Sequence, residues 1–202
     1  MARGTTTVRV PGLAKEFELG DWVQDRLFST TAFAATQSAE VDGLIARAGD
    51  VKPGGTATLT PRESNLPRSG GNGLPPGYEM YVYSLRVFLG ASLTGASVTL
   101  ADVRDMYVKT LFKFLIQSKV KSTGPLYAYP QGSDAYVFTT ANATTYVSNG
   151  QPSERHANAY IIPYELKPDV PFNANFSFDA ALSITAQDIE VAAVGLLKRP
   201  VT

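Results

Sequence analysis

The segment VPFNANFSFD, residues 170–179, alternates apolar and polar side chains along its whole length. Successive side chains of a β-strand point to opposite faces, so this period of two predicts a strand with one buried face. The residues expected on that face are Val170, Phe172, Ala174, Phe176 and Phe178. We therefore expect them, Phe176 included, in the hydrophobic core of a β-protein.

The same period recurs elsewhere in the chain. Residues 78–89 carry a stronger apolar face at the odd positions from 81 to 89, and residues 111–118 alternate Phe112, Phe114 and Ile116 with polar positions. Residues 189–197 are apolar on both faces, which predicts a central, covered strand. Shorter candidate strands are 5–10, 56–60, 97–100, 135–138, 144–148 and 159–166. Pro163 in the last of these predicts a sheet edge or a bulge.

Helical signals are few. Val103, Met106 and Tyr107 fit one face of a helix over 103–109, with Asp102 as its cap. A second helical pattern covers 41–48 and ends at Gly49, although Gly43 weakens it. One or two short helices are expected beside the strands.

Many short strands with turns between them predict an all-β sandwich or barrel. A loop rich in Gly, Pro and Ser, residues 61–77, separates a weakly patterned first part from a strongly patterned remainder. We interpret residues 1–60 as an N-terminal arm or extension, packed on or projecting from a sandwich formed by residues 61–202.

Composition excludes several classes of function. The chain has 202 residues, 18 basic and 18 acidic, so its net charge is zero. No basic arm or stripe is present, and proteins that coat nucleic acid need one to neutralise phosphates. We expect no direct contact with nucleic acid. Cysteine is absent, which excludes disulfides and thiolate chemistry.

The sequence offers no catalytic, cofactor or metal site. His156 is the only histidine, and no nucleophile motif accompanies it. The glycines of 70–73 lack the Lys and the following helix of a phosphate loop. No ligand spacing supports a calcium site at Asp134 and Asn142. The remaining carboxylates considered have no local context that singles them out: Glu63, Asp102, Asp105 and Glu165.

Three segments resemble the jelly-roll coat proteins of tailless icosahedral bacterial viruses. The first is the loop NLPRSGGNGLPPG, residues 65–77, leading into a long strand that contains Leu-Arg-Val at 85–87. The second runs from residue 111 through Gly-Pro-Leu at 124–126 to Tyr-Pro-Gln-Gly at 129–132. The third is the final strand with its Lys-Arg-Pro ending at 198–200. The resemblance covers roughly residues 62–201, and no other part of the chain carries it.

The resemblance implies a jelly-roll β-sandwich, a single roll at this length, that self-assembles into an icosahedral capsid without catalysis. Its partners would be other copies of itself. A second capsid protein and an underlying viral membrane are both compatible with it. The protein would be made in the bacterial cytoplasm and would reside in the virion.

Tyrosines near loops and strand ends are the candidate contacts between subunits, since tyrosine buries area and keeps a polar tip. They are Tyr127, Tyr129, Tyr136, Tyr146 and Tyr160. Aromatic rings also stack on sugars, so a jelly-roll carbohydrate-binding or receptor-binding module that forms a small oligomer is the alternative. Such a module would expose two or three coplanar aromatic rings on one face.

Overall fold

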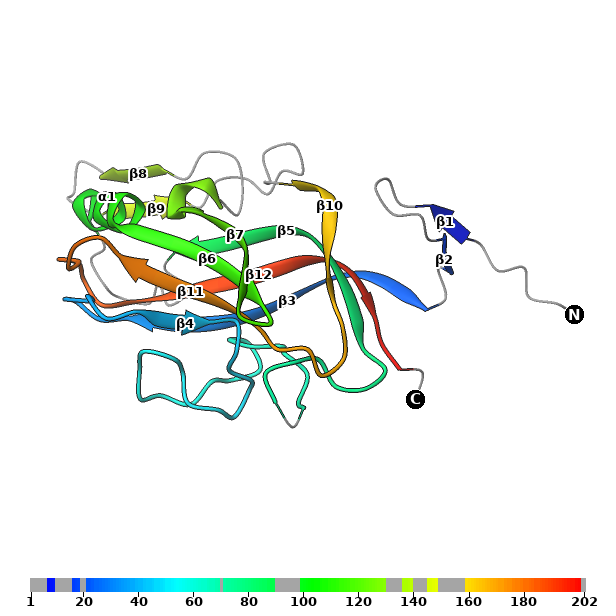
Figure 1. Cartoon of the computed structure of the whole chain (residues 1–202). Helices are drawn as coiled ribbons and strands as arrows, with labels where there is room; N and C mark the ends of the chain where they lie inside the picture. Colours follow the sequence, from blue (N-terminus) through cyan, green and yellow to red (C-terminus); the bar gives the residue numbers. More distant parts are fainter. Residues whose placement is uncertain are drawn as a thin grey trace, which may run out of the picture.

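Two four-stranded antiparallel sheets form an all-β, sandwich-like fold in the computed structural model of the chain (Figure 1). The structure describes residues 7–9, 16–18, 21–69, 71–89, 99–129, 136–139, 145–148 and 159–200.

The first sheet has the strand order β10-β5-β12-β3. Its strands are β3 (Trp22–Phe33), β5 (Glu79–Leu89), β10 (Ala159–Leu166) and β12 (Gln187–Lys198). The predicted central position of residues 189–197 is confirmed, because β12 pairs with β5 on one side and β3 on the other. The prediction for Pro163 is confirmed too: β10 is an edge strand, and its register shifts between Ala159 and Tyr164.

The second sheet has the order β4-β11-β6-β7. Its strands are β4 (Val41–Gly43), β6 (Thr110–Ile116), β7 (Lys119–Pro125) and β11 (Phe172–Phe178). The strand predicted at 170–179 is confirmed, and Phe172, Ala174 and Phe176 are buried as expected. Phe176 packs edge-on against Phe33 of the first sheet at 5.1 Å between ring centroids.

One core fills the space between the sheets, as alternating strands with apolar inner faces require. Its members come from both sheets and include Leu85, Val87, Phe112, Phe114, Ile189 and Val191. Gly195 lies where β12 shifts register against β5. A Cβ atom at Gly195 would collide with the carbonyl oxygen of Tyr81, so the close approach of the two strands requires glycine there.

Two small hairpins accompany the sheets. Strand β1 (Thr7–Arg9) pairs with β2 (Glu16–Glu18), and β8 (Tyr136–Thr139) pairs with β9 (Thr145–Ser148). The first hairpin is held by Phe17, which packs against Trp22 and Tyr81 on the first sheet. This aromatic cluster lies outside the main core.

The described residues contain one α-helix, α1 (Leu100–Lys109), and a 3-10 turn, η1 (Leu126–Ala128). The expected helix is present, but its cap is Thr99 and not Asp102. The Thr99 hydroxyl accepts from the Asp102 amide at 3.2 Å, and the Asp102 carboxylate accepts from the Thr99 amide at 2.9 Å. This reciprocal capping box places Asp102 three residues into the helix.

The organisation expected for residues 1–60 differs from the structure. Strands β3 and β4 belong to this part of the chain, and β3 pairs with β12 over twelve residues. The buried middle of β3 is polar, since Ser29, Thr30 and Thr31 are all enclosed, so its apolar pattern is weak. Hydrogen bonds compensate their burial: Ser29 donates to Ala46 O at 2.7 Å and Thr30 to Glu63 O at 3.0 Å.

Other local predictions also fail. The helix expected over 41–48 is strand β4 followed by turns, because pairing with β11 outweighs a weak helical pattern. Residues 56–60 contribute a single bridge, Val51 to Thr58, in place of a strand. A strand was also expected over 97–100, but Thr99 is the cap of α1 and Leu100 is its first residue.

The segment 44–69 covers the free edge of β3. Backbone amides of β3 donate hydrogen bonds to carbonyl oxygens of this segment: Ala32 N donates to Pro53 O at 2.8 Å and Thr30 N donates to Glu63 O at 2.9 Å. The Lys52 ammonium pairs with Glu63 of the same segment at 2.7 Å and fixes the segment to β12 by an ion pair with Asp188 at 2.8 Å. A covered edge cannot template pairing with another chain.

Candidate self-association surface

Strands β7 and β10, the edges of the two different sheets, lie against each other on one side of the sandwich. The Tyr160 hydroxyl donates to Ser122 Oγ at 3.0 Å, and the Tyr164 hydroxyl donates to the Lys121 carbonyl at 2.8 Å. Ser122 Oγ also shares a hydrogen bond of 2.8 Å with the Tyr129 hydroxyl. Side-chain hydrogen bonds therefore join the two sheets here, where β7 and β10 form no backbone pairing with each other.

Burial raises the pKa of these tyrosines. The pKa of Tyr160 rises to about 12, and those of Tyr129 and Tyr164 rise as well, because desolvation disfavours the phenolate. All three hydroxyls therefore keep their protons, and their hydrogen bonds, across the neutral range.

Exposed aliphatic side chains lie on this same side. Ile161 is 87% exposed and Ile162 is 71% exposed on β10, and Val120 is 52% exposed on β7. The two isoleucines occupy the bulge before Pro163, where β10 leaves its regular pairing with β5. Single exposed apolar residues are ordinary, but two adjacent isoleucines and a valine on neighbouring edge strands make this side a candidate contact surface.

Two exposed lysines accompany Val120 on β7. Lys119 and Lys121 flank Val120 and are both exposed. Glu165 on β10 is neutralised by Lys167 at 3.2 Å. Burial opposes the ionisation of Glu165, but hydrogen bonds from Lys167 and Tyr81 outweigh it and lower the pKa. This side of the sandwich therefore exposes three aliphatic residues and two lysines, and we call it the basic side: Lys119, Val120, Lys121, Ile161 and Ile162.

The tyrosines expected at contacts between subunits are divided by the structure. Tyr127 is 61% exposed in η1, so it remains a candidate. Tyr160 is half-buried and packs towards the core. Tyr129 is only 2% exposed, and its ring packs on Phe112 at 4.5 Å. Its prediction as a surface contact is wrong for that reason. Tyr136 and Tyr146 lie in β8 and β9, and their side chains are outside the described set.

Sequence reasoning missed Ile161 and Ile162. The available signal was their position next to Pro163 in a strand already expected at an edge. Successive side chains of a strand point to opposite faces, so two adjacent bulky residues of an edge strand cannot both face the core.

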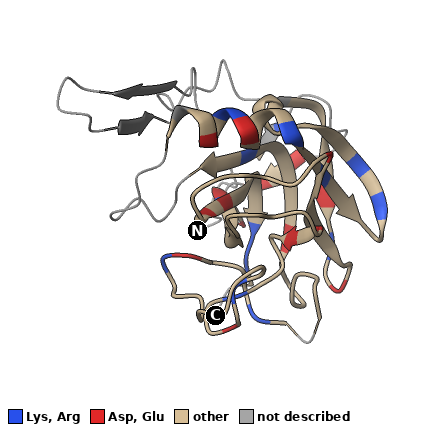
Figure 2. Ribbon diagram, turned by 90° about the vertical axis from the view of Figure 1, so that its left-hand side faces the viewer, with Lys and Arg blue, Asp and Glu red and all other residues tan. Residues whose placement is uncertain are grey.

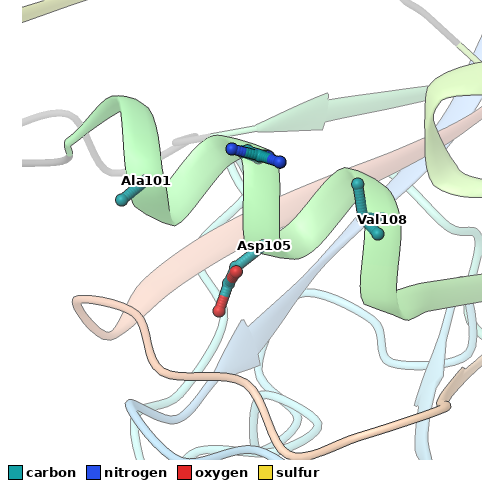
Figure 3. A pocket seen from close by; sticks show the side chains of 4 residues that line it. Ala101, Asp105 and Val108 are labelled. Atoms are coloured by element: carbon teal, nitrogen blue, oxygen red, sulfur yellow. The ribbon is translucent and has the colours of Figure 1, made fainter.

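The exposed face of α1 borders a shallow hollow (Figure 3). Ala101, Arg104, Asp105 and Val108 line it. Lys109 pairs with Asp105 at 2.6 Å, one turn along the helix. The hydrogen bond from Lys109 lowers the pKa of Asp105, so the carboxylate is ionised and neutralised in place. These residues supply no nucleophile with a neighbouring base.

The carboxylates considered from the sequence each have a local structural partner. Glu63 pairs with Lys52, the Asp102 carboxylate accepts from the Thr99 amide, Asp105 pairs with Lys109 and Glu165 with Lys167. Over the described ranges, no group of three or more His, Cys, Asp or Glu side chains could hold a metal ion. His156, Asp134 and Asn142 lie outside those ranges.

Two further surface properties bear on function. Lys and Arg positions are interspersed with Asp and Glu over the described ribbon (Figure 2). The aromatic side chains of Trp22 and Tyr81 are buried under Phe17, and in the described part of the chain Tyr127 is the one strongly exposed aromatic residue. The described side chains therefore include no cluster of strongly exposed aromatic rings.

No protein-family model matches the chain, and no curated protein matches its sequence. No helix in the described part of the chain is long and apolar enough to cross a membrane.

Proposed function

We propose that this chain is a jelly-roll coat protein whose copies assemble into the shell of a bacterial virus and that it performs no catalysis. The pairing order of the eight sandwich strands carries the proposal. Counted along the chain, the first strand pairs with the last (β3 with β12), the second with the seventh (β4 with β11), the third with the sixth (β5 with β10) and the fourth with the fifth (β6 with β7).

This order is the one expected when a single long antiparallel ribbon wraps around a common core, the architecture of a jelly roll. All eight strands fall in one sandwich, which favours a single roll. Six of them, β5 to β12 without the β8–β9 hairpin, come from the part of the chain that resembles coat proteins. The first two, β3 and β4, complete the ribbon.

The distribution of exposed groups favours self-association. A shell subunit needs a rigid body with several surfaces, and each contact can be weak because many act together. The covered edge of β3 prevents indiscriminate strand pairing, while the basic side presents aliphatic residues on a frame fixed by tyrosine hydroxyls. A net charge of zero removes the repulsion that would oppose close packing of many copies.

The test is sedimentation velocity on the full chain over a wide range of concentration and salt, with negative-stain microscopy of the fast fraction. We expect closed particles or regular sheets. Replacing Ile161 and Ile162 by Asn should remove the fast species and leave the melting temperature close to that of the wild type. Val108→Asn, a change at an exposed aliphatic residue of α1, should assemble normally. A wild-type chain that stays monomeric under all conditions would contradict the proposal.

A further inference from the structure

Three hydrogen-bonding atoms on neighbouring residues of β5 are buried without a partner. They are the Tyr83 hydroxyl, the Ser84 hydroxyl and Nε of Arg86. Six side-chain atoms in the described part of the chain share this condition, and three of them fall within residues 83–86. Buried polar groups are normally satisfied, so a cluster of donors without acceptors on one strand requires an explanation.

Ser84 and Arg86 lie on the outer face of the first sheet. Residues 84–89 of β5 pair with β12 in regular register, so their side chains alternate between the two faces. Leu85 and Val87 belong to the main core between the sheets. The residues on either side of Leu85 therefore point away from that core.

A bulge turns Tyr83 to the same face. Ser84 lies opposite Val194 and Val82 lies opposite Gly195, so Tyr83 is an extra residue of β5 with no opposite residue on β12. Its ring packs against the aromatic cluster outside the main core. Bulges direct side chains where a regular strand could not, and this one brings two consecutive hydroxyl groups to the outer face beside Arg86.

The charge of Arg86 is not compensated within the described part of the chain. Arg86 is half-buried, lies opposite Ala192 on β12 and pairs with none of the described carboxylates. The carboxylate at the next outward position of β12 is Glu190, and it is bound to Arg26 at 3.1 Å. Burial raises the pKa of Glu190, and Arg26 is the cation that opposes this rise. A guanidinium cannot lose its proton in a protein, so Arg86 needs an acceptor.

A carboxylate is the class of ligand that fits these groups. Its two oxygens accept several hydrogen bonds, and its bonds to guanidinium donors are about twice as strong as neutral ones. Arg26 and Arg86 carry two positive charges and Glu190 one negative charge, so one positive charge remains on this face. A single negative charge matches it, whereas a dianion such as phosphate would exceed it.

We propose that the outer face of the first sheet binds a carboxylate through Arg86 and Ser84. The guanidinium of Arg86 supplies the charge, and the hydroxyl of Ser84, a residue only 4% exposed, donates a further hydrogen bond. The carboxylate belongs either to a small free molecule or to a side chain of a second copy, and its chemistry is the same in both cases. The site stands independently of the proposed self-association.

NMR of the arginine Nε–H groups in the ¹⁵N-labelled full chain tests the site. The chain carries Ile161→Asn and Ile162→Asn and is used at concentrations where sedimentation shows single copies. Sodium acetate replaces sodium chloride at constant ionic strength. The Arg86 resonance, identified by its loss in Arg86→Lys, should shift and reach saturation. The resonance of Arg104, an exposed arginine of α1, is the control and should not saturate.

Ser84→Ala should weaken acetate binding about tenfold, because it removes a hydrogen bond to a charged group. Ser177→Ala, which removes a hydroxyl from the second sheet, is the matched control and should bind acetate like the parent chain. Circular dichroism and melting temperature must show that each variant is folded. An Arg86 resonance that follows acetate no differently from Arg104 would overturn the site, and so would an unchanged affinity in Ser84→Ala.

Sedimentation velocity of the wild type separates the two sources of the carboxylate. If a second copy supplies it, acetate should weaken association relative to chloride, and Arg86→Gln should weaken it in both salts. If a free molecule supplies it, association should be the same in both salts and in Arg86→Gln. A wild type that never associates would overturn the coat function, whereas the NMR titration alone decides whether the carboxylate site exists.

Discussion

Tyr160 of β10 donates a hydrogen bond to Ser122 of β7, with 3.0 Å between the two hydroxyl oxygens. The two residues belong to the edge strands of different sheets, so this bond joins the sheets where no backbone pairing does. Tyr129 shares the same Ser122 hydroxyl at 2.8 Å. The basic side is thereby held in one shape before any second copy arrives, which reduces the ordering that association would otherwise require.

Ser122→Ala should destabilise the fold by about 1–3 kcal/mol, because it leaves two partly buried tyrosine hydroxyls without their shared partner. Urea denaturation followed by circular dichroism measures the change. Thr123→Ala, at the neighbouring exposed position, is the control and should lie within about 0.5 kcal/mol of the wild type. Equal stability of the two variants would show that the tyrosine hydroxyls do not hold the sheets together.

Phe176→Ala should lower the free energy of unfolding by about 3–5 kcal/mol. Phe176 is fully buried and contacts Phe33 of the facing sheet at 5.1 Å and Phe112 of its own sheet at 5.5 Å, so truncation leaves a cavity between the sheets. Thermal unfolding is the measurement, with Ser177→Ala, one position along the strand, as the control. A melting temperature within a degree of the wild type would mean that the site collapses without cost.

The free energy of unfolding should decrease in acid, because Glu63 becomes protonated and loses its ion pair with Lys52. The hydrogen bond from Lys52, together with those from Thr60, lowers the pKa of Glu63 from 4.5 to about 2. A carboxyl group whose pKa is lower in the folded chain stabilises it above the unfolded pKa, and this contribution is lost as the pH falls from about 5 to about 2.

Lys52→Met removes the largest cause of that shift. Between about pH 5 and pH 2 the variant should therefore lose less unfolding free energy than the wild type. Urea denaturation at a series of pH values gives both curves. Lys113→Met, which removes the longer pair with Glu40, should follow the wild-type curve. Identical slopes for Lys52→Met and the wild type would rule out this role for the Lys52–Glu63 pair.

Phe17→Ala should shift the fluorescence of Trp22 to longer wavelength. Trp22 is the only tryptophan of the chain, and the Phe17 ring lies 4.9 Å from it and 5.2 Å from Tyr81. Removing the ring lets water reach the indole, while the main core is untouched because the aromatic cluster lies outside it. Glu18→Ala, in the same strand, should leave the emission unchanged. An unshifted Phe17→Ala spectrum would show that Phe17 does not shield Trp22.

Deletion of residues 1–20 should give the same shift in emission and should impair assembly, while the sandwich stays folded. The deletion removes the β1–β2 hairpin and stops before β3, so all eight sandwich strands remain. Circular dichroism and sedimentation velocity check the two parts. Loss of the β signal would mean that the hairpin is required for folding.

The sequence by itself determined where period-two strands lie. The strands Glu79–Leu89, Thr110–Ile116 and Phe172–Phe178 fall on the period-two segments because side-chain alternation is a local property of the extended backbone, and burying one face of each is enough to place Phe112, Phe114 and Phe176 in a core. Pro163 marked the edge strand for an equally local reason, since proline cannot donate to a ladder.

Only the tertiary structure decided the rest. Strand β3 is a strand because β12 pairs with it over twelve residues and because the segment 44–69 satisfies its buried hydroxyls, and neither partner is near it in the sequence. Tertiary contacts also decided the burial of Tyr129, which bonds to Ser122 and packs on Phe112. They likewise decided the exposure of Ile161 and Ile162, which lie where β10 shifts its register against β5. Which residues alternate follows from the geometry of one backbone, whereas which edges meet and which side chains stay exposed follows from long-range pairing that no local pattern encodes.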